Sequence, residues 1–242
     1  MNLQISLFLS ILVLIAFTKT ADADHFSAGI TAYEKGDPEE ALMQFQAALV
    51  TNENAATLHN LALTYLKLEQ PTDAIWQMER AVRLDPRNKN YNYKLKAMRE
   101  QLGLFTAPTK WYENISQLLP IDQWIILITF SSWTWLALLI IPRIAGTSLN
   151  YSLKFCRTFS FLILVASLLP IVVLSQAQTD GIIISDEVVS VHAAPASAAP
   201  IKGNARPGER AKVVEQYNNY LKIKTEGQVI GWISQDLLHT IL

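Results

Sequence analysis

The sequence predicts a multidomain membrane protein made of an all-α repeat domain, two transmembrane helices and a small all-β barrel. Three observations lead to this fold class. The stretches Gly36–Glu53 and Glu69–Pro86 resemble each other. Two uncharged apolar stretches follow, and the C-terminal part alternates β-branched and polar residues between short turns. These patterns are typical of helical repeats, membrane-spanning helices and short strands, respectively.

Residues 1–23 predict export. They contain an apolar run, ISLFLSILVLIAF, followed by the small-residue pattern Ala21-Asp22-Ala23. This order is typical of a signal peptide, although no Lys or Arg precedes the apolar run. A cleaved signal peptide and an uncleaved anchor both fit the pattern, and both send the following residues out of the cytoplasm.

The repeat domain is predicted over residues 24–104, as two helix pairs and a capping helix. Small residues on the second helix of the first copy, Ala41 and Ala48, recur in the second copy as Ala74 and Ala81. Alanines spaced in this way let a neighbouring helix approach closely. Pro38 and Pro71 stand where proline can open a helix. A period of about 33–34 residues with this layout indicates a helical repeat array.

This layout resembles the tetratricopeptide repeat. The second copy matches the family's pattern at Leu61, Ala62, Tyr65, Ala74, Ala81 and Pro86. The first copy matches at Gly29, Gly36, Ala41, Phe45 and Ala48, and departs from the pattern at Glu53, where the closing proline would stand. The segment KNYNYKLKAMREQLG looks like a third first-helix that caps the stack with a polar outer face.

In that family the first helices line a concave groove that binds a partner. The resemblance places these residues in the groove: Phe26, Ile30, Tyr33, His59, Leu63, Lys67, Tyr93 and Ala97. Of the positions that some members use to clamp a C-terminal carboxylate, only Asn60 is in register. An apolar and aromatic groove suggests a helix or an extended apolar peptide as the partner. Simple packing of Tyr33 and Tyr93 between helices is the alternative.

Two transmembrane helices are predicted after a linker over residues 105–123. They cover residues 124–142 and 159–175, which is about the length needed to cross a hydrocarbon core. The loop between them, residues 143–158, carries Arg143, Lys154 and Arg157 and no acid. Cytoplasmic loops have this basic excess, so the repeats and the C-terminal region are predicted on the outer side.

The C-terminal segment, residues 176–242, predicts a small barrel. Its order of strands, turns, Gly231-Trp232 and the final QDLLHTI resembles the bacterial SH3 domain. The aromatic residues available for a binding surface are Tyr217, Tyr220 and Trp232. For Trp232, packing in the core is as consistent with the pattern as contact with a ligand.

No pattern in the sequence indicates an enzyme, a cofactor or a metal site. The four histidines, His25, His59, His192 and His239, are scattered, and there is one cysteine, Cys156. No Gly-rich phosphate loop and no nucleophile motif is present. The near-neutral charge balance argues against a nucleic acid partner.

The order of all these parts resembles the E component of the Bat (Bacteroides aerotolerance) membrane proteins. This resemblance implies other Bat proteins with von Willebrand A domains as partners, and indirectly a MoxR-type ATPase. It also implies a bacterial inner-membrane location with both soluble parts on the periplasmic side, and a scaffold role in envelope stress tolerance. The alternative function is binding or sensing of peptidoglycan through the barrel.

Overall fold

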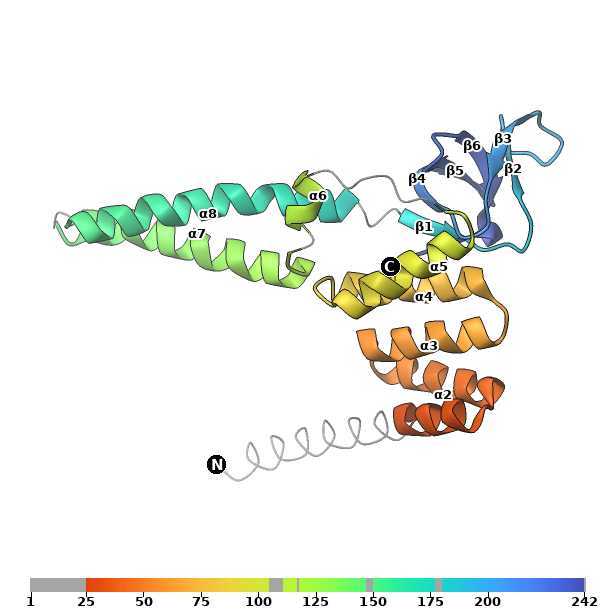
Figure 1. Cartoon of the computed structure of the whole chain (residues 1–242). Helices are drawn as coiled ribbons and strands as arrows, with labels where there is room; N and C mark the ends of the chain where they lie inside the picture. Colours follow the sequence, from red (N-terminus) through yellow and green to blue (C-terminus); the bar gives the residue numbers. More distant parts are fainter. Residues whose placement is uncertain (1–24, 105–110, 117, 147–149, 177–179, 242) are drawn as a thin grey trace, which may run out of the picture. The chain divides into compact units, whose positions relative to one another are not determined.

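The computed structural model describes residues 25–104, 111–116, 118–146, 150–176 and 180–241. These residues form two compact units (Figure 1). We call the first the bipartite unit, because it joins the helical region, residues 25–104, to the barrel, residues 181–241. The second, the helical hairpin, contains the described residues from 111 to 180. The predicted signal or anchor segment, residues 1–23, lies outside the described residues.

Short helices follow one another through the helical region. A helix over residues 25–35 precedes α2 (Pro38–Thr51), α3 (Ala55–Lys67), α4 (Pro71–Leu84) and α5 (Lys89–Gln101). Proline opens α2 and α4, where its missing N–H costs no helical hydrogen bond. Asn54 caps α3, since its side chain accepts a hydrogen bond from the Thr57 N–H at 2.9 Å.

The turn that ends each first helix is repeated in detail. The same type of backbone hydrogen bond, from residue i to residue i−5, closes each of the three turns. It runs from Asp37 N to Ala32 O (3.0 Å), from Gln70 N to Tyr65 O (2.9 Å) and from Leu104 N to Arg99 O (2.8 Å). The residue before each donor has a positive φ, +82° at Gly36, +60° at Glu69 and +67° at Gly103. The helical region therefore contains two helix pairs and the first helix of a third unit.

Small residues make the close helix contacts that the sequence predicted. Four alanines are fully buried: Ala41, Ala48, Ala74 and Ala81. Gly29 serves the same purpose in the first helix, because a Cβ at this position would lie 2.6 Å from the ring of Phe45. The internal repetition thus follows from small residues placed where helices cross, with Phe45 and Met78 filling the space between them.

The helical hairpin contains α6 (Trp111–Ser116), α7 (Ile121–Ile144) and α8 (Tyr151–Gln176). Both long helices extend beyond the predicted spans, and α8 begins well before residue 159. Lys154 and Arg157 consequently lie in the first turns of α8 rather than in a loop. Apolar composition marks the part of a helix that suits lipid, whereas backbone hydrogen bonding continues through the polar residues at its end.

By length and composition, α7 and α8 are suited to cross a membrane. Their most apolar windows have mean hydropathies of 2.0 and 2.4, and most residues of these windows are not buried within the structure. Phe130, Trp133 and Leu162 are 75%, 68% and 61% exposed. The hairpin does not cover its own apolar surface.

The C-terminal part is a curled antiparallel sheet. Its strands are β1 (Asp180–Ile183), β2 (Val189–His192), β3 (Ile201–Ala205), β4 (Arg210–Tyr217), β5 (Tyr220–Thr225), β6 (Ile230–Ser234) and β7 (Leu238–Thr240). They lie in the order β3-β2-β6-β5-β4-β1-β7. Side chains that alternate along the strands fill a separate core: Ile183, Val189, Val191, Ala205, Ala211, Leu221, Ile223, Ile233 and Leu238.

The helical region and the barrel also share one hydrophobic core. It combines helical residues with two residues of the sheet end: Leu58, Ala62, Ile75, Met78, Ala81, Leu95, Met98, Leu104, Ile182 and Ile241. Ile182 is fully buried in this core. The barrel therefore contacts α4 and α5. The other side of α5 carries exposed polar residues, among them Asn92, Lys96 and Glu100.

Candidate interaction surfaces

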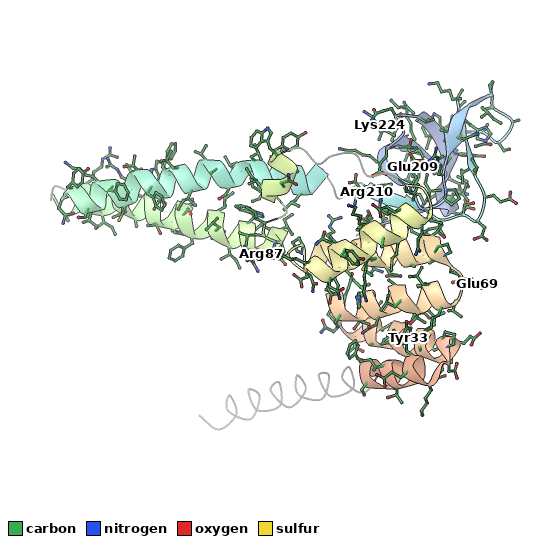
Figure 2. The ribbon with its side chains drawn as sticks, in the orientation of Figure 1. Tyr33, Glu69, Arg87, Glu209, Arg210 and Lys224 are labelled. Carbon is green, nitrogen blue, oxygen red and sulfur yellow. The ribbon has the colours of Figure 1, made fainter. Side chains whose placement is uncertain are left out.

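Two aromatic–lysine contacts connect the successive first helices. The first lies between the helix over residues 25–35 and α3. Lys67 Nζ lies 3.7 Å from the centroid of the Tyr33 ring and donates a hydrogen bond to the Tyr33 carbonyl oxygen at 3.1 Å. Figure 2 labels Tyr33 on the first helix pair. The structure thus brings together two of the predicted groove residues, and the cation–π contact holds the lysine on the ring.

The second contact connects α3 to α5. The His59 ring stacks on Tyr91 with centroids 4.8 Å apart, and Lys94 Nζ lies 3.0 Å from His59 Nε2. Burial lowers the pKa of His59, and the nearby charge of Lys94 lowers it further. The unprotonated nitrogen of a neutral imidazole can accept a hydrogen bond from the Lys94 ammonium group, so this geometry fits the uncharged form of His59.

The other predicted groove residues make separate contacts. Phe26 packs on a small core of Ala32, Ala41, Phe45 and Leu61, with its ring 6.0 Å from that of Phe45. Asn60 is partly buried beside His59, and its backbone carbonyl oxygen accepts a hydrogen bond from Thr64 Oγ1. Tyr93 is 73% exposed. The ring that stacks on His59 belongs to Tyr91 instead.

Sequence comparison of the copies missed Tyr91 and Lys94. The residue equivalent to His59 in the repeat is Tyr93, whereas the ring that stacks on His59 belongs to Tyr91. Neighbouring helices cross at an angle, so the residues that touch need not be equivalent in the repeat. The sequence did contain one indication of this contact, since a second aromatic residue, Tyr91, lies two positions before Tyr93.

The three aromatic candidates of the barrel lie on the outer face of its sheet. Tyr217 on β4 pairs with Tyr220 on β5, and Tyr217 is 57% exposed. Trp232 on β6 pairs with Lys222 and with His192, and only 8% of its surface is exposed. The two tyrosines are therefore available to a partner, whereas Trp232 is mostly covered.

A buried charge network joins α4 and α5 to the barrel. Glu79 of α4 accepts hydrogen bonds from Arg99 of α5 at 3.0 Å and from Arg210 of β4 at 2.5 Å. Arg99 also pairs with Glu226 of the barrel. The side chains of Arg99 and Glu79 are only 2% and 4% exposed. Figure 2 labels Arg210 at the edge of the barrel.

The pKa of a carboxyl group in this network depends on its burial as well as on its ion pairs. Burial raises the pKa of Glu226, while Arg99 and Arg210 act in the opposite direction. The network is supported by Trp76, whose indole N–H donates to the Thr240 carbonyl at 2.7 Å and whose ring meets His239 edge-on. Arg206 of the barrel also donates to the Gly103 carbonyl at 3.2 Å.

These surfaces expose aromatic rings and lysine side chains, which are groups suited to binding another molecule. Among the described residues, no group of three or more His, Cys, Asp or Glu side chains is placed to hold a metal ion. Cys156 is exposed in α8.

Comparison with known families supports one part of the sequence interpretation. Residues 187–239 match the model of the bacterial SH3 domain. The prediction of an SH3-like C-terminal region is confirmed, and these residues form a bacterial SH3 domain. No curated protein matches the chain.

Proposed function

We propose that this chain is a non-enzymatic, membrane-anchored scaffold of the bacterial envelope, with a tetratricopeptide-type helical region and an SH3-like barrel that recruit other proteins. The observation that carries the proposal is the bipartite unit. The helical region and barrel share a core and a buried charge network, although the apolar hairpin separates them in the sequence. Two parts in contact must lie in the same compartment, and a hairpin with two spans returns the chain to the side it left.

Lipid is the environment that suits the helical hairpin. Large apolar side chains on α7 and α8 stay exposed in the single chain. Exposed apolar surface of this extent is costly in water, whereas a helix satisfies its backbone hydrogen bonds in a bilayer. The basic residues Arg143, Lys154 and Arg157 favour a cytoplasmic position for the hairpin turn. The bipartite unit would then be periplasmic.

The repeated turns support the tetratricopeptide interpretation. One hydrogen bond and one positive φ recur at each turn, at the spacing of the sequence repeat. The face that carries Tyr33, Lys67, His59 and Tyr93 is the proposed docking surface. Bat-type partners with von Willebrand A domains, and indirectly a MoxR-type ATPase, remain the partners that the resemblance favours.

Reporter fusions test the orientation. A reporter that is active only in the cytoplasm should work when inserted after Asn150, in the turn between α7 and α8. A reporter that requires export should work at the C-terminus. Activity of the cytoplasmic reporter at the C-terminus would contradict the periplasmic placement of the barrel, and with it that of the helical region.

Alanine replacement tests the docking surface. Changing Tyr33, His59 and Tyr93 together should remove the proteins that cross-link to the full chain in native membranes, because aromatic anchors carry about 2 kcal/mol or more of binding energy at interfaces. Hydrogen exchange should show that the helices remain protected. The control is Tyr217→Ala on the barrel. Loss of partners with Tyr217→Ala, and their retention in the triple variant, would place docking on the barrel instead.

A second candidate function is binding or sensing of peptidoglycan. The match of residues 187–239 to the bacterial SH3 domain favours this second function, since peptidoglycan is one of the two classes of ligand, with proteins, that such a domain suggests. Retention of the full chain on purified sacculi, lost with Tyr217→Ala, would support this function over the scaffold. The full chain is needed because Ile182 and Ile241 belong to the shared core.

A further inference from the structure

The outer face of the barrel carries two lysines directly opposite each other. Lys212 on β4 pairs with Lys224 on β5, and Lys224 pairs with Ile230 on β6. Opposed residues on neighbouring strands point to the same side, and like charges in this arrangement destabilise a sheet. Among the described residues, neither lysine has a carboxylate within ion-pair distance. Lys222 on the same face differs, because it pairs with Glu215 at 3.0 Å.

Apolar side chains accompany these lysines. Ile230 is 43% exposed, and Val214, which lies at the irregularity of β4, is 59% exposed. We call Lys212, Lys224, Val214 and Ile230 the lysine face. Figure 2 labels Lys224 on the barrel. The neighbouring Arg210 contacts Glu79 of α4, so the helical region covers one end of this sheet surface and leaves the lysine face open.

The covalent chain holds the barrel close to the end of α8. Gln176 ends α8 and Asp180 begins β1, so four peptide steps span at most about 14 Å. The polar layer of a bilayer is about 5–8 Å thick on each side of the hydrocarbon core. If α8 crosses the membrane to its last apolar residues, Asp180 lies within about 14 Å of the hydrocarbon core, so the headgroups are within reach of the barrel. Lys212 is on β4, the neighbour of β1 in the sheet.

We infer that the lysine face binds anionic phospholipid headgroups of the membrane that the hairpin spans, an inference that rests on the proposed membrane anchoring. Lipid phosphates would neutralise the opposed ammonium groups of Lys212 and Lys224. Val214 and Ile230 would enter the boundary between headgroups and acyl chains. Each basic residue near an anionic surface strengthens such contact about five-fold, so the pair supplies roughly 25-fold.

The test uses the full chain in lipid nanodiscs, one set of phosphatidylcholine alone and one with added phosphatidylglycerol. Because Cys156 is the only cysteine, Cys156→Ser with Val214→Cys gives a single labelling position on the lysine face. A fluorophore there should be quenched by a nitroxide on the lipid headgroup, more strongly in the anionic discs. Lys212→Gln with Lys224→Gln should weaken the contact by roughly 25-fold.

The matched control is Lys35→Gln with Lys89→Gln, which removes the same charge from the helical region and should leave the quenching unchanged. Equal quenching in the two lipids, or quenching that does not depend on Lys212 and Lys224, would overturn the inference. Lysine-dependent binding of soluble peptidoglycan fragments without any effect of lipid charge would also overturn it, in favour of a wall-binding face. Incorporation into discs without quenching would contradict this inference alone, whereas failure to incorporate would contradict the membrane anchoring as well.

Discussion

Replacing Glu79 with alanine is expected to destabilise the bipartite unit by about 3 kcal/mol, because it leaves only the partly exposed Glu226 to balance the buried charge of Arg99. Glu79 receives hydrogen bonds from both Arg99 and Arg210, and Arg99 is only 2% exposed. The loss should appear on both sides of the network. Hydrogen exchange of the full chain in nanodiscs should show faster exchange in α4 and α5 and in β4 and β5 together.

The control for this variant is on the same helix as Arg99. Lys96 pairs with Glu100 at 3.8 Å, and both side chains are mostly exposed. Lys96→Ala should cost at most about 1 kcal/mol, as is typical of surface ion pairs. If Glu79→Ala accelerates exchange in the helices and leaves the strands unchanged, the network does not couple the two parts.

Ile182→Ala should have the second large effect, about 2–5 kcal/mol, since it removes buried methyl groups and leaves a cavity. Ile182 belongs to the barrel sequence but is fully buried in the core that contains Ile75 and Met78 of α4. A defect in the sheet should therefore reduce hydrogen-exchange protection in α4 and α5. This result would not arise in a protein whose barrel folds independently.

Val188→Ala provides the matched control. Val188 follows Ile182 closely along the chain and is 58% exposed. Its truncation should change stability by no more than about 0.5 kcal/mol, as for other surface positions. Equal effects of the two substitutions would contradict the shared core. An effect of Ile182→Ala confined to the barrel would do so as well.

The candidate binding residues were predictable only in part. Tyr33 and Lys67 are in contact, as expected for groove residues that stand one repeat period apart on successive first helices. His59 contacts Tyr91 and Lys94 instead of Tyr93, because the angle at which two helices cross decides which side chains touch. The outward position of Tyr217 and Tyr220 follows from strand alternation. The coverage of Trp232 depends on its neighbours across the sheet, which the sequence does not specify.

Local patterns in the sequence determined the helical repetition, the two apolar helices and the SH3-like strands. Each of these depends on residues that are close in the chain. Alanines that recur with the repeat period set the helix contacts, an uncharged run gives an apolar helix, and alternation gives a strand with one buried face. The family match at residues 187–239 confirms the last of them.

Only the tertiary structure decided that the helical region and the barrel form one unit. The contacts that join them link residues separated by 127, 131 and 164 positions, at Arg99–Glu226, Glu79–Arg210 and Trp76–Thr240. In the sequence, Glu79 and Arg99 have the pattern of ordinary solvent-exposed charges on amphipathic helices. Their burial results from a sheet that follows the helical hairpin in the sequence and packs back on α4 and α5. No local pattern encodes such a contact, because its free energy comes from surfaces that meet only when the chain is folded.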